Sequence, residues 1–312
     1  MNIQFPRPLS APTRVGLIAP ASFPADMTRI ESGIVVMASH GLTVERFRTP
    51  GSGRGYLAGT DDERAEELNH FLRRTDVDAL ICIRGGYGCM RLLERLDWEA
   101  ARAHPKLLVG YSDITALHLA FFKHAGWTGI SGPMAAVEWP DPDLPSLKQF
   151  FELAAGHTGP LSGPSGEPMR GVNPGIATGR ILGGNLSMVV RLLGTPHLPD
   201  LEGAILVVED VGEEPYQIDA YLSQLKMAGV LDRLGGLVFG GLTEGDVRPG
   251  KASLTIEEVL SDYVQPLAIP VADRLLYGHF PVKCSVPIGV QARLTVSGPD
   301  ARLDVLESVV AS

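Results

Sequence analysis

Cysteine is scarce in this sequence, which excludes a disulfide-stabilised fold. The three thiols, Cys82, Cys89 and Cys284, are odd in number and lack the paired spacing of zinc or redox motifs. The zinc-protease pattern HExxH is missing, as are clusters of histidine and aspartate, so we expect no metal site. Neither a Walker loop nor a GxGxxG motif occurs, and the sequence therefore predicts no cofactor.

Basic residues and long apolar segments are in short supply as well. Lysine and arginine number 27 against 36 aspartate and glutamate, for a net charge of −9. A general nucleic-acid binder needs a basic face to neutralise phosphates, so nucleic acid is not an expected partner. No segment reaches the length of a membrane span, and the N-terminus, MNIQFPRPLSAPTR, lacks the apolar stretch of a signal peptide. We therefore expect no membrane association and a cytoplasmic location.

What the sequence does contain is enough apolar material for two domains. The chain has 312 residues and is 45% hydrophobic, and domains average about 150 residues. In the first half, apolar strand patterns at 15–20, 79–83 and 107–110 alternate with helical patterns at 28–39 and 61–74. Strict alternation predicts a parallel sheet with helices on both faces.

The second half differs in its pattern. Residues 204–210 form a strong strand pattern, and the alternating residues 290–306 surround a Gly-Pro-Asp turn and predict a β-hairpin. The segment 179–186, GRILGGNL, reads as a glycine-rich turn. The sequence thus predicts an α/β protein in which an N-terminal parallel-sheet α/β domain is followed by a β-rich, mixed C-terminal domain.

A stretch rich in glycine, proline and serine separates the two halves and reads as an interdomain linker. We therefore place the N-terminal domain at 1–160, the linker at 161–178 and the C-terminal domain at 179–312. The alternative is a long surface loop within one domain.

Three motifs directly follow predicted strands: RGGYG from Arg84, GYSD ending at Asp113, and the pair that begins with Glu209. Ligands of open parallel sheets collect beyond the carboxyl ends of the strands. In GYSD, the strand–turn–helix order presents Ser112 as in a nucleophile elbow, although a helix N-cap is an equally simple role for serine. The glycines of RGGYG allow close approach of a ligand, and fit half of an oxyanion hole, a phosphate cradle or a plain tight turn.

Histidine is the usual general base, and His279 is the best of the eight candidates because it lies in an irregular segment between strands. His118 lies six residues after Ser112 on a predicted helix and so points to a different face. A structural histidine remains the alternative. Glu209 ends an apolar strand, where a carboxylate needs a partner, and could orient a histidine or form a structural salt bridge.

Taken together, the motifs resemble the LD-carboxypeptidase family, also called muramoyltetrapeptide carboxypeptidases. The resemblance covers nearly the whole chain, through LIAPAS, RGGYG, VGYSDITALH, GRILGGNLSMVVRLLGTP, LVVEDVGEEPYQIDAYLSQL and YGHFPVKCSVPIGV in this order. It implies two domains with an active site between them. It also implies a catalytic triad of Ser112, Glu209 and His279.

The resemblance further implies a serine carboxypeptidase that removes terminal D-alanine from murein-derived peptides through an acyl-enzyme, without a cofactor. The expected oxyanion donors are the backbone amides of Gly86 and Asp113. Arg84, Gly85 and Asn185 are the expected substrate-binding residues. Family members are often dimers, which implies a homodimer here.

Two other functions fit the same residues. A second branch of the family comprises immunity peptidases that cleave microcin C-like peptide-nucleotides, and their pockets need aromatic residues for the base. This chain is only 6% aromatic, and its three tryptophans do not lie in obvious cleft loops, which favours the murein branch. A non-catalytic ligand-binding α/β module, in which Ser112 merely caps a helix, is the third possibility.

Overall fold

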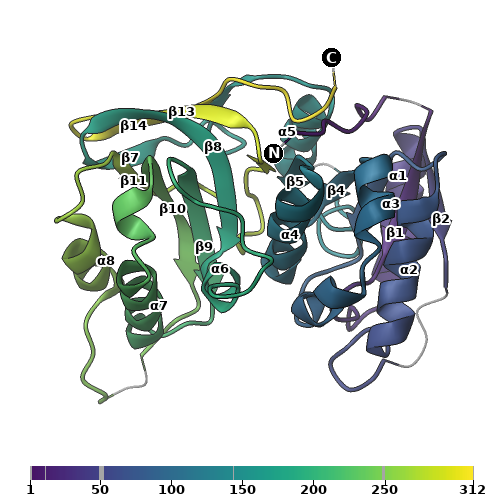
Figure 1. Cartoon of the computed structure of the whole chain (residues 1–312), viewed down its shortest axis with the longest axis horizontal. Helices are drawn as coiled ribbons and strands as arrows, with labels where there is room; N and C mark the ends of the chain where they lie inside the picture. Colours follow the sequence, from purple (N-terminus) through teal and green to yellow (C-terminus); the bar gives the residue numbers. More distant parts are fainter. Residues whose placement is uncertain (1, 11, 49–52, 143, 248–249, 312) are drawn as a thin grey trace.

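The computed structural model describes residues 2–10, 12–48, 53–142, 144–247 and 250–311. Two β-sheets stand side by side, and helices α4 (Thr115–Ala125) and α6 (Leu186–Arg191) lie at the boundary between them (Figure 1). Within the described ranges, no helix combines the length and apolar character needed to cross a bilayer.

The first sheet confirms the predicted parallel α/β domain. Its strand order is β12-β5-β4-β3-β1-β2, and all neighbours are parallel except β12 and β5. The other elements of this half are β1 (Thr13–Ile18), α1 (Thr28–Ser39), β2 (Leu42–Arg46), α2 (Asp61–Arg73), β3 (Ala79–Cys82), η1 (Cys89–Arg95), α3 (Trp98–Ala103), β4 (Leu107–Val109), η2 (Ser112–Ile114), β5 (Gly129–Ser131) and α5 (Pro145–Ala154).

The strand order places a topological switch point between β1 and β3. From β1 the chain crosses to β2 on one side, and from β3 it crosses to β4 on the other. The loops that follow β1 and β3 therefore separate at the carboxyl edge, where open α/β sheets leave a crevice for ligands. The RGGYG motif occupies the loop after β3.

The second sheet confirms the predicted β-rich, mixed domain. It runs β13-β8-β9-β10-β11-β7-β14-β6, and pairing of β13 with β14 closes it into a barrel-like ring. Closure removes the exposed edges of seven of the eight strands. Its elements are β6 (Gly159–Leu161), β7 (Met169–Asn173), β8 (Gly175–Asn185), β9 (Ile205–Val211), α7 (Pro215–Met227), η3 (Leu231–Arg233), β10 (Gly236–Thr243), α8 (Ile256–Val264), β11 (Val271–Asp273), β13 (Gln291–Ser297) and β14 (Asp300–Val305).

The glycine-rich segments differ from their sequence-based interpretation. The expected linker, 161–178, contains β7 and the start of β8, and the expected turn in GRILGGNL is the end of β8. Proline and glycine are tolerated here because Pro164, Pro168 and Pro174 lie between the strands, and Gly179 and Gly183 of β8 pass close to neighbouring backbone. How the chain divides into independent units at 1–160, 161–178 and 179–312 stays a prediction.

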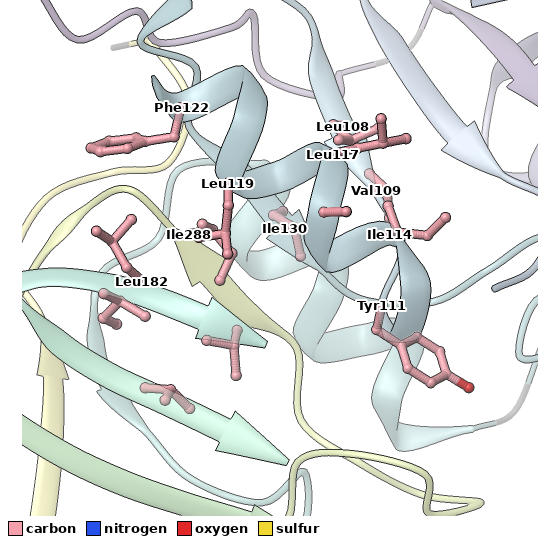
Figure 2. Packing of buried hydrophobic residues seen from close by; sticks show 14 of the residues in the cluster. Leu108, Val109, Tyr111, Ile114, Leu117, Leu119, Phe122, Ile130, Leu182 and Ile288 are labelled. Atoms are coloured by element: carbon pink, nitrogen blue, oxygen red, sulfur yellow. The ribbon is translucent and has the colours of Figure 1, made fainter. Parts of the chain in front are cut away.

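A continuous apolar core joins the two halves. Strand β12 (Val286–Ile288) belongs to the C-terminal part of the chain but pairs with β5 of the first sheet. Figure 2 shows Ile288 of β12 beside Leu119 of α4, with Leu182 of β8 facing them from the second sheet. The return of the chain to the first sheet brings the segment just before β12 close to the GYSD turn.

Candidate active site

Glu209 and His279 form a hydrogen-bonded pair. Strand β9 holds Glu209 in a fully buried position, and its Oε2 lies 2.8 Å from Nδ1 of His279. Because Nδ1 is bound to the carboxylate, Nε2 is the ring nitrogen left for proton transfer. Gly278 permits this contact, since it has φ +129° and a Cβ there would lie 2.9 Å from Glu209 Oε2.

Ser112 occupies a strained turn between β4 and α4. Its φ of +64° is rare for a residue other than glycine, and its side chain caps neither η2 nor α4. The helix-capping alternative is therefore not what the structure contains. A half-buried serine on a left-handed turn after a parallel strand has the backbone geometry of a nucleophile elbow.

The RGGYG loop packs directly against this turn. A Cβ on Gly85 would lie 2.8 Å from Ser112 Cβ and 3.1 Å from its Oγ, so only glycine fits. Gly86 is exposed, and its N–H has no acceptor among the residues that the structure describes. This amide is thus free to donate to a ligand, as an oxyanion donor must.

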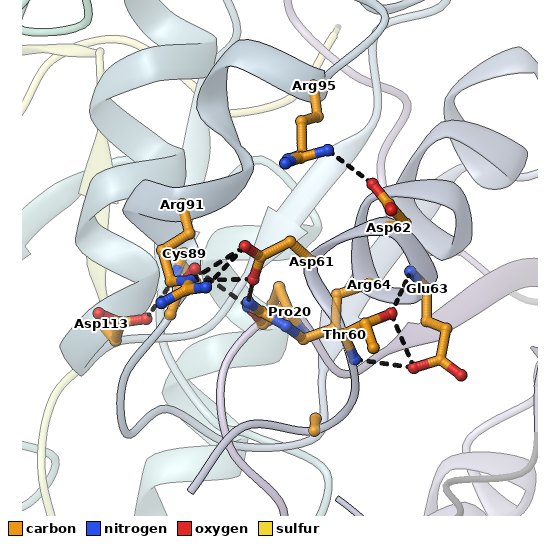
Figure 3. A network of polar contacts seen from close by, with 12 residues as sticks. Pro20, Thr60, Asp61, Asp62, Glu63, Arg64, Cys89, Arg91, Arg95 and Asp113 are labelled. Carbon is orange, nitrogen blue, oxygen red and sulfur yellow. Dashed lines mark hydrogen bonds and ion pairs between the residues drawn. The ribbon is translucent and has the colours of Figure 1, made fainter. Parts of the chain in front are cut away.

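Asp113 uses its side chain to fasten the two loops together. Its buried carboxylate accepts a 2.8 Å hydrogen bond from the Cys89 N–H at the end of RGGYG, and burial raises its pKa. Arg64 continues the network, since it donates to the carbonyls of Pro20 and Gly88 and contacts Asp61 (Figure 3). The loops after β1, β3 and β4 are therefore held as one unit.

The other two predicted side chains have internal partners. Arg84 is half-buried and donates to the carbonyl of Phe23 at 2.9 Å. Asn185 is buried, caps α6, and donates to Asp210 at 2.8 Å and to Glu209 Oε1 at 3.4 Å. Asn185 therefore supports the carboxylate of the pair, and a substrate contact by either residue stays a prediction.

The nucleophile candidate and the pair are close but not joined. The ring of Tyr111, which precedes Ser112, meets the His279 ring edge-on with centroids 5.2 Å apart. In the described part of the chain, no hydrogen bond links Ser112 to His279. The complete triad of Ser112, His279 and Glu209 thus stays a prediction. The structure supports it with the hydrogen bond between His279 and Glu209 and with the contact of His279 with Tyr111, the residue before Ser112.

His118 lies on the same side of the boundary as Ser112 but has a structural setting. It is buried in α4, its Nε2 bonds to the Gly110 carbonyl at 2.9 Å, and burial lowers its pKa to about 4. A histidine held neutral by burial, with its Nε2 bound to backbone, is unsuited to shuttle protons near neutral pH.

Among the described residues, no three His, Cys, Asp or Glu side chains gather as metal ligands would.

Sequence reasoning missed a buried polar group beside the site. Glu138 and Lys283 are an ion pair with Nζ and Oε1 2.7 Å apart, and Tyr111 contacts both. Their signal in the sequence is a single charge within an apolar run, AAVEW and VKCSV, which does not reveal the partner.

A cavity of about 720 Å³ lies next to the His279 loop in the second half. Phe280, Gly240 and Gly241 form the wall on the side of the pair, and Arg274 lines it as well. Its volume is within the usual range for small-ligand sites, about 300–1,000 Å³.

Comparison with known proteins places this fold and site in a family. The description "LD-carboxypeptidase N-terminal domain" matches residues 15–132, and "LD-carboxypeptidase C-terminal domain" matches residues 178–294. A "Probable murein peptide carboxypeptidase" of Bacillus subtilis is 36% identical, over 96% of this chain and 94% of that protein. The crystal structure of muramoyltetrapeptide carboxypeptidase from Oxalobacter formigenes has a TM-score of 0.81 at 31% identity, covering 94% and 98% of the two chains.

A relative with a different stated role is also similar. The microcin C7 self-immunity protein MccF of Escherichia coli is 25% identical, over 98% of this chain and 96% of its own.

The family match and the carboxypeptidase relatives show that the present protein is a serine-type peptidase, a hydrolase of peptide bonds. Within that class, the chain belongs to the LD-carboxypeptidase family.

Proposed function

We propose that the protein removes the terminal D-alanine of murein tetrapeptides, with Ser112 as nucleophile, His279 as base and Glu209 as the carboxylate that orients the base. One observation carries the proposal: a 2.8 Å hydrogen bond between buried Glu209 and half-buried His279 lies beside a serine held at φ +64°. The similarity to the murein carboxypeptidases of Bacillus subtilis and Oxalobacter formigenes supports the substrate class.

The proposed reaction is acyl transfer in two halves. Ser112 Oγ attacks the carbonyl carbon before D-alanine while His279 Nε2 takes the hydroxyl proton. The same proton then passes to the leaving amine, D-alanine departs, and an ester joins the peptide to Ser112. Water attacks this ester, gives its proton to His279, and the serine recovers its proton as the peptide acid leaves. Glu209 stabilises the imidazolium in both halves.

The negative oxygen of each tetrahedral intermediate needs hydrogen-bond donors. We propose the N–H groups of Gly86 and Asp113, which stand on the two loops that flank Ser112. The free carboxylate of D-alanine needs a cationic partner, and Arg84 is the cationic residue of the RGGYG motif. Gly85 provides the space between the loop and the nucleophile, and Asn185 holds Glu209 from behind.

The setting of the enzyme is part of the proposal. We propose a cytoplasmic homodimer that acts on murein-derived peptides in peptidoglycan recycling, without nucleic acid, membrane or cofactor.

The test is release of D-alanine from a tetrapeptide that ends in L-Lys-D-Ala or diaminopimelate-D-Ala. We expect the wild-type protein to cleave this bond and to leave a matched all-L peptide intact. In Ser112→Ala, kcat should fall by about 10⁶-fold, as for other serine-triad nucleophiles. Activity that survives the substitution, in protein with an unchanged circular dichroism spectrum, would contradict the triad.

A second candidate is cleavage of a microcin C-like peptide-nucleotide. Two exposed aromatic rings favour it: Tyr87 of the RGGYG loop meets Tyr56 with ring centroids 5.6 Å apart, beside the proposed oxyanion donor. Such a pair can stack on a base. A higher kcat/KM for an aminoacyl-nucleotide amide than for the tetrapeptide, reduced by Tyr87→Ala, would favour this function over the first.

A further inference from the structure

A buried ion pair lies behind the proposed active site and connects the two halves of the chain. Lys283 and Glu138 are 6% and 2% exposed, and their charged groups are 2.7 Å apart. Glu138 also accepts a 2.9 Å bond from the Met134 N–H, and Lys283 donates to the Phe280 carbonyl at 3.1 Å. Two buried charges with this many partners are held in one geometry.

Tyr111 connects this ion pair to the proposed catalytic groups. Its hydroxyl donates to Glu138 Oε1 at 3.1 Å, and Lys283 Nζ lies 3.9 Å from the centre of its ring. Burial and the Glu138 carboxylate raise the pKa of this phenol well above its usual value, so the hydroxyl stays protonated as a donor. The ring of Tyr111 also meets the His279 ring edge-on, and Ser112 directly follows Tyr111 in the chain. Tyr111 therefore contacts the ion pair and the proposed base at once.

The His279 loop has further attachments to the first half, and Lys283 lies in the middle of them. Before the loop, Tyr277 Oη lies 2.7 Å from Ser131 Oγ. After it, the Lys283 and Ser285 amides donate to side chains of α5, Ser146 Oγ at 2.9 Å and Gln149 Oε1 at 3.0 Å. These contacts fix the ends of the loop, whereas the Lys283 ammonium reaches inward to the tyrosine beside Ser112.

We propose that Lys283, Glu138 and Tyr111 are positioning residues that set the distance between the His279 imidazole and the Ser112 hydroxyl. The proposal rests on the proposed function of that site. Its physical basis is that the nucleophile and the base come from different halves of the chain, with no hydrogen bond between them in the described residues. A misplacement of about 1 Å between reacting groups can lower a rate by about 100-fold.

The experiment compares two lysines that are buried to the same degree. Lys283→Met removes the ammonium of the ion pair, and Lys106→Met removes a lysine that is 1% exposed and bonds to the carbonyls of Arg74 and Val77. Lys106 immediately precedes β4, at the strand end opposite to Ser112, so it is a matched control. We expect kcat to fall by about 10- to 100-fold in Lys283→Met with KM within about twofold, and to stay near wild type in Lys106→Met.

The double variant Lys283→Met, Glu138→Gln separates positioning from stability. Neutral replacement of both members of a buried ion pair often leaves stability unchanged, whereas removal of one member leaves a buried charge unpaired. We expect the melting temperature of the double variant to return toward wild type while kcat stays low. Recovery of kcat together with stability overturns the proposal, as does an equal loss of kcat in Lys106→Met. The double variant carries the test if Lys283→Met does not fold.

A substrate-free measurement keeps this inference distinct from the proposed function. The proton on His279 Nδ1, bonded to Glu209 and close to Tyr111, should give a low-field resonance in the proton NMR spectrum. We expect the signal to shift or broaden in Lys283→Met and to be unchanged in Lys106→Met. If the wild type cleaves no tetrapeptide, the proposed function fails while this signal still reports on positioning. An identical signal in wild type and Lys283→Met overturns the inference whatever the activity.

Discussion

Ser112 lies on a turn between two elements, whereas Glu209 lies inside strand β9 of a closed sheet. The first half of the molecule offers its functional groups from loops at the carboxyl edge of a parallel sheet, next to the switch point between β1 and β3. The second half offers a buried carboxylate from a strand that is paired on both sides, and a histidine on a loop that returns to the first sheet.

The difference follows from what each group has to do. A nucleophile and oxyanion donors need exposed atoms and free N–H groups, which loops and turns provide. The backbone strain of this arrangement is visible in the positive φ of Ser112 and in the positive-φ glycines beside it. A carboxylate that orients a histidine works better in a rigid, water-poor place, because hydrogen bonds to a charged group are stronger there.

Among residues that do not themselves react with the substrate, the largest effect should come from the rigid side of this comparison. Glu209→Gln keeps the shape of the side chain but no longer fixes the tautomer of His279 or stabilises its protonated form. We expect kcat to fall by about 10⁴-fold, as for the equivalent change in other triads, with KM little changed. Steady-state release of D-alanine measures it, and a loss below tenfold would mean that Glu209 does not act through His279.

Buried His118 should make the stability of the fold depend on pH. His118 has a pKa of about 4 in place of its ordinary 6.5, because the folded protein buries it uncharged. Below pH 6.5 the His118 imidazole binds a proton in the unfolded chain but stays neutral in the folded chain. The unfolding free energy is therefore unaffected by this group above pH 6.5 and falls as the pH drops toward 4. The loss should reach about 3 kcal/mol of unfolding free energy.

Urea unfolding of wild type and His118→Asn at pH 7 and pH 4 measures the contribution of His118 to this loss. The variant lacks the titrating ring, so its unfolding free energy should fall less over the same interval. Equal losses in both proteins would show that acid destabilisation comes from other groups.

A smaller effect should come from the packing of the RGGYG loop against the nucleophile. Gly85→Ala places a methyl group 2.8 Å from Ser112 Cβ and should displace the serine, lowering kcat by about 100-fold. Gly236→Ala in β10 is the control, because the tightest contact of its methyl group would be a terminal methyl of Leu294 at 3.0 Å, with Pro270 O and Ile205 Cγ1 no nearer than 3.5 Å. A kcat in Gly85→Ala equal to that of the control would contradict a tight fit between RGGYG and the nucleophile.

Much of the fold could be predicted from local patterns. The helix over Thr28–Ser39 and the one beginning at Asp61, whose Thr60 and Glu63 form a capping box, follow from side-chain spacing and capping chemistry. The strands at 204–210 and the final hairpin follow from apolar runs and a turn. For the glycine-rich segment around β7 and β8, local composition predicts a linker and a turn, because it does not reveal pairing with distant strands.

For the site, the sequence indicated Ser112 after a predicted strand, Glu209 at the end of an apolar strand pattern and His279 in an irregular segment, and the family's motifs point to the same three residues. It did not mark Glu138 or Lys283, whose meaning depends on a partner 145 positions away in the chain. A single charge in an apolar run signals burial with a partner, but nothing in the run says which partner.

Local side-chain patterns determined many strands and helices of this protein, though not β7 and β8, and the ordered motifs indicated its family. The tertiary structure alone decided that β12 returns to the first sheet, that the histidine loop lies beside the GYSD turn, and that Glu209 bonds to His279. The reason is that helix and strand propensities act over a few residues, whereas these contacts join segments from 70 to more than 150 positions apart, which only packing of the whole chain brings together.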